Sequence, residues 1–259
     1  MTIKLADIDP GSTPHALKGE KAALKDTADH IERLANLQGR LYAEGSRALL
    51  VVFQAMDTGG KDGAVKHVFT GVNPSGVHVA SFKAPTPVEL DHDYLWRIHA
   101  QAPAKGDIVI FNRSHYESVL IERVHSLVPK KTWKARYDQI NAFEQLLVSE
   151  GTTIVKFFFH ISKDEQRRRL LSRLDDQSKQ WKFNVGDIDE RKLWDDYMAA
   201  YEDAVNKTST DGAPWHVVPA NHKWYRNYVV SKVLVETLEK MNPRYPTRDD
   251  LKSVDRDAI

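Results

Sequence analysis

Five short runs of mostly apolar residues alternate along the chain with longer segments in which apolar residues recur three and four positions apart. The runs have the length of strands buried on both faces, and they cover residues 48–53, 77–82, 107–111, 153–161 and 215–219. The other segments have the helical period and cover residues 18–43, 62–72, about 89–99, about 132–149, about 190–207 and 224–241. This alternation predicts an α/β fold with a doubly wound parallel sheet.

Three stretches depart from this pattern. Residues 1–17 are polar and contain Pro10 and Pro14, which predicts a flexible N-terminal arm. Residues from about 163 to 189 are strongly charged, and we expect them to form a mobile insertion within a single domain of residues 18–242. Residues 243–259 contain two further prolines and predict a loose C-terminal tail.

Composition narrows the class of protein. The 37 Lys and Arg residues of this 259-residue chain nearly balance its 36 Asp and Glu residues, whereas a nucleic-acid-binding protein usually has a basic excess. No apolar run approaches the roughly 20 residues that cross a bilayer, and the first ten residues lack the apolar core of a secretory signal. The absence of cysteine excludes disulfides and thiolate zinc sites. We therefore expect a cytoplasmic enzyme with no membrane or nucleic-acid partner.

A candidate phosphate-binding loop lies between the first predicted strand and the helix after it. Glycines there let successive N–H groups turn toward one anion, and Lys61 can reach a phosphoryl oxygen. The segment departs from the usual motif at Ala55 and Asp62, where that motif has Gly and Ser or Thr. We expect Lys61 to be exposed without ligand, and the predicted phosphate-binding residues are Thr58, Gly59, Gly60, Lys61, Asp62, Gly63 and Lys66. The alternative is a glycine-rich turn with an exposed lysine.

Asp57 lies inside this loop and changes its chemistry. A carboxylate in an anion-binding loop repels the anion unless a cation or a proton is shared between them. One solution is a Mg²⁺ ion that bridges Asp57 and phosphate oxygens, since Mg²⁺ prefers oxygen ligands. The other is that Asp57 accepts a proton from the attacking group or orients it. Both roles remain open at this point.

A second polar cluster follows the third predicted strand. The run Asn-Arg-Ser-His-Tyr-Glu occupies residues 112–117. Ligands in parallel sheets bind at the carboxyl ends of strands, which favours a functional site over an ordinary polar loop. We expect Arg113 to neutralise developing charge and a nucleotide to contact Asn112, His115, Tyr116 and Glu117.

Segments 57–63, 111–117, 181–182, 215–220 and 223–227 together resemble the polyphosphate kinase 2 family. The resemblance implies a three-layer P-loop kinase fold, similar to thymidylate kinase, with a central five-stranded parallel sheet and a helical lid at about residues 163–189. It also implies transfer of phosphoryl groups between inorganic polyphosphate and nucleotides, with Mg²⁺ or Mn²⁺ as cofactor. Members commonly form dimers or tetramers, so we expect a homo-oligomer.

Residues 112–117 resemble the class III branch of this family, which uses both AMP and ADP and forms ADP and ATP. Guanine nucleotides are further candidate substrates. Other members carry Asp at the position of Asn112 and Asn at that of Glu117, so the resemblance gives no metal-ligand role to position 112. The catalytic residues that we assign are Asp57, Lys61 and Arg113, with Asp57 as the metal ligand.

Residues 163–182 contain seven cations and four acids. A polyphosphate chain carries about one negative charge per phosphate, and a row of arginines and lysines suits it. Arg169 and Arg173 are four residues apart and share a helix face, and we expect them to bind polyphosphate together with Lys182. The alternative is a solvated helix face.

The sequence therefore predicts a polyphosphate-dependent nucleotide kinase. Two other functions fit parts of the same pattern. One is a P-loop kinase that transfers phosphate from ATP to a small metabolite, and the other is a non-catalytic module that binds nucleotide or polyphosphate.

Overall fold

A five-stranded parallel sheet is the centre of the computed structural model, which describes residues 2–16, 18–249 and 251. Its strand order is β2-β3-β1-β4-β5. The strands are β1 (Ala48–Ala55), β2 (Val77–Ser81), β3 (Ile108–Asn112), β4 (Thr152–His160) and β5 (Trp215–Pro219). The predicted parallel α/β sheet is confirmed, because each apolar run forms one strand and all neighbouring pairs are parallel.

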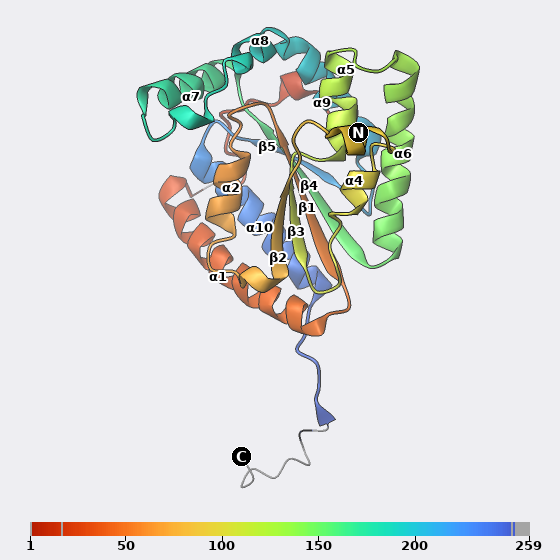
Figure 1. Cartoon of the computed structure of the whole chain (residues 1–259). Coiled ribbons are helices and arrows are strands. Elements are labelled where there is room, and N and C mark those ends of the chain that lie inside the picture. The colour runs from red at the N-terminus through yellow and green to blue at the C-terminus, as the bar shows by residue number, and fades with distance from the viewer. Residues whose placement is uncertain (1, 17, 250, 252–259) are drawn as a thin grey trace.

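Helices cover both faces of this sheet. On one side lie α1 (Glu20–Glu44), α2 (Lys61–Val68) and α10 (Lys223–Met241), and α10 packs against the other two (Figure 1). On the other side lie α6 (Lys130–Ser149) and α9 (Trp194–Thr208), together with the short helices α4 (Trp96–His99) and α5 (Ile121–Val124). The central strand β1 is buried along its whole length, which explains its continuous apolar sequence.

Two predicted helices are each divided into two pieces. The segment near residues 89–99 forms α3 (Pro87–Leu90) and α4, because a Thr86–Glu89 capping box starts one turn that ends at Asp91. The segment near residues 190–207 forms α8 (Gly186–Lys192) and α9, because Leu193 between them leaves the helical conformation. The remaining elements are α7 (Lys163–Asp175) and the 3₁₀ turns η1 (Leu5–Asp7), η2 (Pro74–Gly76), η3 (His115–Val119) and η4 (Gln180–Lys182).

The N-terminal segment is held against the domain. The Ile3 amide donates to Asn206 and the Leu5 amide donates to Glu202, both at 2.8 Å, and Leu5 is buried. The prediction of a flexible arm is therefore wrong for these residues, because two apolar side chains among the polar ones find partners next to α9. Residues 1 and 17 of the predicted arm lie outside the described residues.

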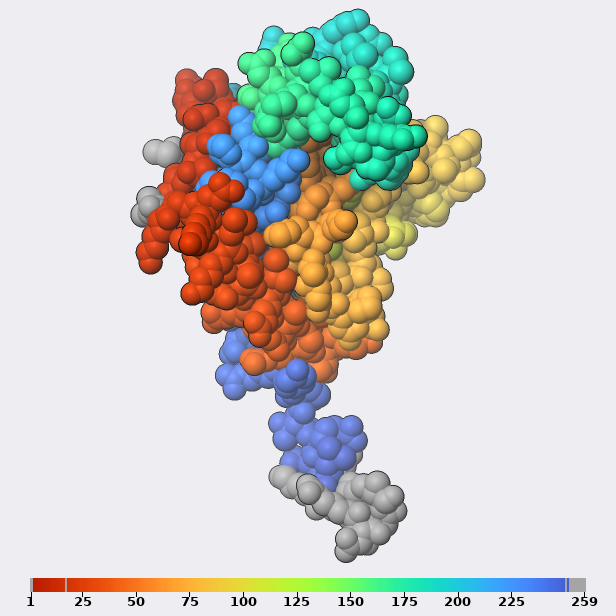
Figure 2. Space-filling view, turned by 90° about the vertical axis from the view of Figure 1, so that its left-hand side faces the viewer, coloured from red at the N-terminus to blue at the C-terminus, as the bar shows by residue number. Residues whose placement is uncertain are grey.

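The C-terminal tail leaves the body of the protein after α10 (Figure 2). Asn242 ends the helix in the left-handed conformation, and Tyr245 is exposed. Residues 250 and 252–259 of the predicted loose tail lie outside the described residues. In the part of the chain that the structure describes, no helix has the length and apolar character to cross a bilayer.

Candidate active site

The carboxyl ends of β1 and β3 bring the two predicted clusters together. Phe53 of β1 lies opposite Asn112 of β3, and the Arg113 amide donates to the Phe53 carbonyl at 3.3 Å. The loop from Met56 to Gly60 therefore starts beside Arg113. Helices α7 and α8 and the turn η4 between them, the predicted lid, lie beyond this end of the sheet (Figure 1).

The phosphate-binding loop has the backbone that an anion site requires. Gly60 is the N-cap of α2 with a positive φ of 101°, and no side chain caps the first turn, so the amides of that turn are available to an anion. A Cβ on Gly59 would lie 2.4 Å from the Ala55 Cβ, so only glycine fits there. Thr58 and Arg113 both have positive φ, which is strained for residues other than glycine and is typical of functional sites.

Lys61 lies inside this loop rather than in solvent. Its Nζ donates to the Ala55 carbonyl at 2.9 Å, and the residue is 9% exposed. Burial lowers its pKa, and the neighbouring Arg113 guanidinium lowers it further. The expectation of an exposed Lys61 is therefore wrong, because the loop folds around the side chain and offers it a carbonyl oxygen.

Asp57 and Arg113 form an ion pair across the entrance to the loop. Arg113 Nη2 donates to Asp57 Oδ1 at 2.9 Å, and Gln166 Nε2 of α7 donates to the Asp57 carbonyl at 3.2 Å. Burial disfavours the Arg113 cation, but the nearby Glu117 and Asp57 carboxylates raise its pKa above the ordinary value. Arg113 is thus charged and half-buried next to the phosphate position.

Only Oδ1 of Asp57 accepts a side-chain hydrogen bond from the described residues. No cluster of three or more His, Asp or Glu residues in the described ranges could bind a metal by itself. Mg²⁺ usually takes one or two carboxylates and completes its shell with substrate phosphates and water. Asp57, which has a second oxygen available beside the loop, fits a metal shared with a phosphate ligand.

Asn112 and Lys182 both contact Asp62, the first acidic residue of α2. Asn112 Nδ2 donates to Asp62 Oδ1 at 2.7 Å, and Lys182 Nζ lies 3.7 Å from Asp62 Oδ2. The side-chain amide of Asn112 therefore donates to Asp62, whereas an aspartate at position 112 would be repelled by it. Lys182, predicted from the charged run, is brought to the phosphate loop.

Glu117 borders a cavity of about 200 Å³ on the α4 and α6 side of the sheet. Burial raises the pKa of Glu117, against the opposing effect of Arg113. Tyr94 Oη and His115 Nδ1 are buried and have no hydrogen-bond partner among the described residues, and both residues line this cavity. A ligand with hydrogen-bonding groups would satisfy them.

Tyr116 does not reach this cavity. Its side chain is 0% exposed, and its hydroxyl lies within hydrogen-bond distance of both Glu144 Oε1, at 2.8 Å, and Thr208 Oγ1, at 2.9 Å. The prediction that Tyr116 binds nucleotide is therefore wrong, because its hydroxyl belongs to a buried network with Glu144 and Lys156. His115 lies mostly in the same network, with Nε2 3.1 Å from Glu144 Oε1.

The predicted polyphosphate cations have separate environments. Arg169 is buried and donates to the Thr58 carbonyl at 3.0 Å and to the Ala220 carbonyl at 2.6 Å, so it supports the loop rather than facing a channel. Arg173 donates to the Lys182 carbonyl at 3.1 Å. Lys66 is exposed on α2. The expected row of Arg169 with Arg173 is wrong at Arg169, because that guanidinium is already surrounded by carbonyl oxygens and Glu165.

Sequence analysis missed Arg226, which lies in the first turn of α10 against Gly60. Residues 223–227 are one of the segments that resemble the family, so the sequence did mark this region. Because Arg226 follows the phosphate loop by more than 160 residues, however, nothing in the sequence placed it beside Gly60. Gln54 was also missed; its Nε2 donates to Glu117 at 3.2 Å.

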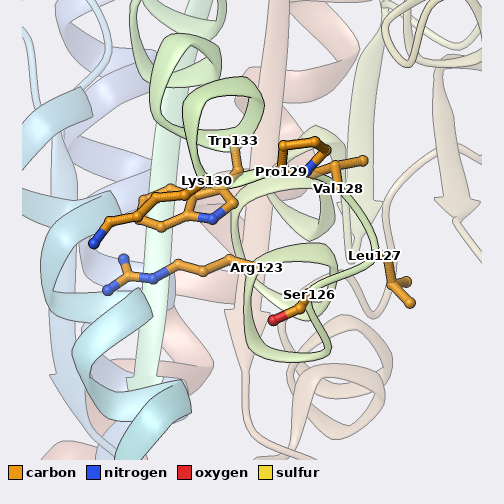
Figure 3. Close-up of a pocket in the computed structure, with 7 residues that line it drawn as sticks. All are labelled: Arg123, Ser126, Leu127, Val128, Pro129, Lys130 and Trp133. Carbon is orange, nitrogen blue, oxygen red and sulfur yellow. The ribbon is translucent and has the colours of Figure 1, made fainter.

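A larger hollow of about 510 Å³ lies between α5 and α6 and contains none of the predicted residues (Figure 3). The Arg123 guanidinium lies 4.6 Å from the centre of the Trp133 ring in its wall and pairs with Asp203 at 2.7 Å. Arg123 is therefore already neutralised, and Lys130 is the other cation that lines the hollow.

Comparison with known proteins agrees with this geometry. The family description "Polyphosphate kinase 2" matches residues 18–246. The chain is 58% identical over 244 residues to the AMP/ADP-polyphosphate phosphotransferase of Meiothermus ruber, covering 94% of this chain and 91% of that protein. It is 49% identical to the ADP-polyphosphate phosphotransferase of Rhodopseudomonas palustris, covering 83% of this chain and 79% of that protein.

Among solved structures, the crystal structure of polyphosphate kinase 2 from Arthrobacter aurescens TC1 superimposes with a TM-score of 0.94. The two are 48% identical in sequence, and the match covers 99% of this chain and 90% of that one. The expected P-loop kinase fold is thus confirmed. Fold, loop geometry and sequence agree over nearly the whole chain, which belongs to the polyphosphate kinase 2 family.

Proposed function

We propose that this protein transfers phosphoryl groups between inorganic polyphosphate and AMP or ADP, forming ADP and ATP. The observation that carries the proposal is the convergence of Lys61, the α2 amides and the Arg113–Asp57 pair at one end of the sheet. The names of the Meiothermus ruber and Rhodopseudomonas palustris relatives support the choice of polyphosphate and adenine nucleotides.

The loop would hold the phosphoryl group in transfer. Phosphoryl transfer depends on positioning and on neutralising the charge of the equatorial oxygens. Lys61 would exchange its Ala55 carbonyl for a phosphoryl oxygen, and the amides of Thr58, Gly60, Asp62 and Gly63 would surround the anion. The Gly59 amide donates to the Met56 carbonyl at 2.9 Å, so Gly59 would shape the loop instead. Arg113 would stabilise charge that develops on the transferred group. Lys66, Arg173 and Lys182 would contact more distant phosphates.

Asp57 would hold the metal that this chemistry uses. Mg²⁺, or Mn²⁺ in its place, would supply positive charge to phosphate oxygens. Arg113 keeps one oxygen of Asp57 fixed at 2.9 Å, so the carboxylate is oriented before substrate arrives. Asp57 would also orient the attacking phosphate oxygen of the nucleotide.

The cavity beside Glu117 would take the acceptor nucleotide. It contains the unpartnered Tyr94 hydroxyl and His115 nitrogen, which suit the polar edges of a nucleotide, and Arg97 and Arg136 stand in its wall. Asn112 and Glu117 would mark its boundary with the phosphate loop. Guanine nucleotides carry the same phosphates and ribose, and we propose them as additional acceptors.

The segment of residues 163–189 would act as a lid. Gln166 donates to the backbone of Asp57, so movement of α7 reaches the loop directly. Closure would exclude water and favour transfer over hydrolysis. We further propose that the protein acts in the cytoplasm as a homodimer or homotetramer, which light scattering would test.

One assay tests the function. Purified protein is incubated with Mg²⁺, long-chain polyphosphate and either AMP or ADP, and ATP is measured, with EDTA and omission of polyphosphate as controls. ATP formation that requires both polyphosphate and metal supports the proposal. Turnover only with ATP and a small metabolite would favour a different P-loop kinase, and ligand-induced thermal stabilisation without product would favour a binding module.

A further inference from the structure

Arg226 lies closer to the phosphate loop than its place in the sequence suggests. It belongs to the first turn of α10 and is 2% exposed. A Cβ on Gly60 would lie 1.9 Å from Arg226 Nη1, so the guanidinium packs directly on the backbone of the loop. The same group lies within 3.4 Å of a Cβ built on Gly63. Position 60 thus requires glycine for two reasons: its φ is positive, and the Arg226 guanidinium lies against it.

The charge of Arg226 is not neutralised by the described residues. Its Nε and Nη2 donate to Asn227 Oδ1 at 3.2 and 2.7 Å, and the Phe159 ring lies 5.8 Å away. No carboxylate among the described residues forms an ion pair with it. Burial, together with the neighbouring Arg169 cation, lowers the pKa of Arg226 to about 10. A buried cation without an anion is unfavourable, so its presence here indicates an anion that the folded protein receives from a ligand.

The surroundings of Arg226 suit a phosphate. Lys223 lies in the same first turn of α10 and is exposed, and burial together with Arg169 and Arg226 lowers its pKa. Among the described residues no side chain caps that turn or the first turn of α2. At Gly60 itself, the Arg226 guanidinium is joined by Arg169, whose Nη1 lies 3.5 Å from a Cβ built on the glycine. The buried, unneutralised guanidinium is what distinguishes this place from an ordinary helix end.

The position of Arg226 identifies which phosphate it would meet. Helices α2 and α10 lie on one side of the sheet, whereas α4, α6 and the cavity beside Glu117 lie on the other (Figure 1). In Figure 2 the blue segment that leads into α10 is at the surface between α2 and α7, so an extended chain can reach it from solvent. A nucleotide in the Glu117 cavity would approach the loop from the opposite side.

We propose that Arg226, assisted by Lys223, binds a phosphate of the polyphosphate donor on the α10 side of Gly60. The proposal rests on the proposed function, and it adds a specific donor contact to it. Arg226 acts on the donor alone, so its removal should affect polyphosphate and leave the nucleotide site intact.

The test compares Arg226→Met and Arg226→Lys with wild type. Methionine keeps most of the volume but removes the charge, and Lys232→Met on the same helix, far along from the loop, is the matched control. Steady-state kinetics are measured with polyphosphate varied at saturating AMP and with AMP varied at saturating polyphosphate. Thermal unfolding is measured without ligand and with inorganic triphosphate.

For Arg226→Met we expect the KM for polyphosphate to rise roughly 10- to 100-fold, the range for losing a hydrogen bond to a charged group. The KM for AMP should stay within about two-fold. The midpoint of thermal unfolding without ligand should stay the same or rise, because an unneutralised buried cation has been removed, and triphosphate should no longer raise it. Arg226→Lys should recover part of both effects.

Three results would overturn the proposal. The first is an unchanged KM for polyphosphate, and the second is an increase confined to the KM for AMP. The third is a lowered unfolding midpoint together with an increase in both KM values, because that combination would mean that Arg226 has a structural role. The triphosphate measurement needs no turnover. If wild type formed no ATP, the proposed function would fail, while loss of the triphosphate shift in Arg226→Met alone would still show anion binding by Arg226.

Discussion

Two groups of buried charges in this protein are compensated in opposite ways. Lys156 of β4 donates to Glu144, to the Tyr116 hydroxyl and to the Thr208 carbonyl, so every charge in that network has an opposite partner. At the phosphate loop, Lys61 donates only to a backbone carbonyl. Arg226, likewise, forms no ion pair with a described residue.

This difference in compensation distinguishes charges that stabilise the fold from charges that bind a ligand. A fully satisfied buried network fixes one arrangement of the core, and breaking it leaves an isolated charge. Cations that have only neutral partners lower the stability of the free protein and favour the arrival of an anion. Burial by itself therefore does not separate structural from functional charges in this protein. What sets Lys61 and Arg226 apart from Lys156 is that neither forms an ion pair with a described residue.

The largest effect is expected from breaking the satisfied network. Glu144→Ala leaves Lys156 buried without its carboxylate, and we expect a loss of about 3–5 kcal/mol in the free energy of unfolding. Denaturant unfolding measures this, with exposed Glu150→Ala, from the end of the same helix, as the control. A loss below about 1 kcal/mol would show that the network is not the stabilising element described here.

Lys61→Met should reduce activity without reducing stability. Turnover should fall roughly 10²- to 10³-fold, the scale for losing one preorganised electrostatic contact. The free energy of unfolding should not fall, because burial disfavours the Lys61 ammonium more than the nearby Asp57, Glu117 and Asp62 carboxylates favour it. Kinetics and unfolding are compared with exposed Lys240→Met. Near-normal turnover would contradict the assignment of Lys61 to the phosphate.

A smaller effect concerns pH. Burial lowers the pKa of His115 in the folded protein below its ordinary value of about 6.5. As the pH falls below that value, the unfolded chain takes up a proton that the folded state resists, so stability decreases toward acid. His115→Gln should remove up to about 1.4 kcal/mol of this decrease per pH unit, measured by unfolding between pH 7 and 5. Exposed His67→Gln should leave the slope unchanged, and an unaltered slope in both variants would be evidence against a neutral buried His115.

The smallest effect is expected from the lid. Arg173→Ala should raise the KM for polyphosphate about five-fold at low salt, corresponding to ~1 kcal/mol, the upper range for an exposed charge pair. The effect should shrink at high ionic strength through screening. Kinetics at two salt concentrations measure it, with exposed Arg168→Ala as the control. An unchanged KM at low salt would leave Arg173 as a surface residue.

Sequence could predict what depends on local pattern. The strands were predictable because apolar runs such as 48–53 are continuous, and the loop was predictable because glycines precede Lys61 directly. The environments of Tyr116 and Arg169 were not predictable. Tyr116 contacts Glu144 and Arg169 contacts Thr58, and both partners are distant in the chain and come close only through the packing of α6 and α7. The contacts of Ile3 and Leu5 with α9 were not predictable either, because α9 is distant in the chain and the N-terminal segment is mostly polar.

The approach of Arg226 to Gly60 also restricts how this protein can change over evolutionary time. Any side chain at position 60 would overlap the guanidinium, whose Nη1 is 1.9 Å from the first added carbon. Replacing Gly60 therefore has two separate costs, the positive φ of 101° and the overlap with Arg226. A shorter residue at position 226 would remove only the overlap, so glycine should persist at position 60 even in a lineage that has lost the arginine.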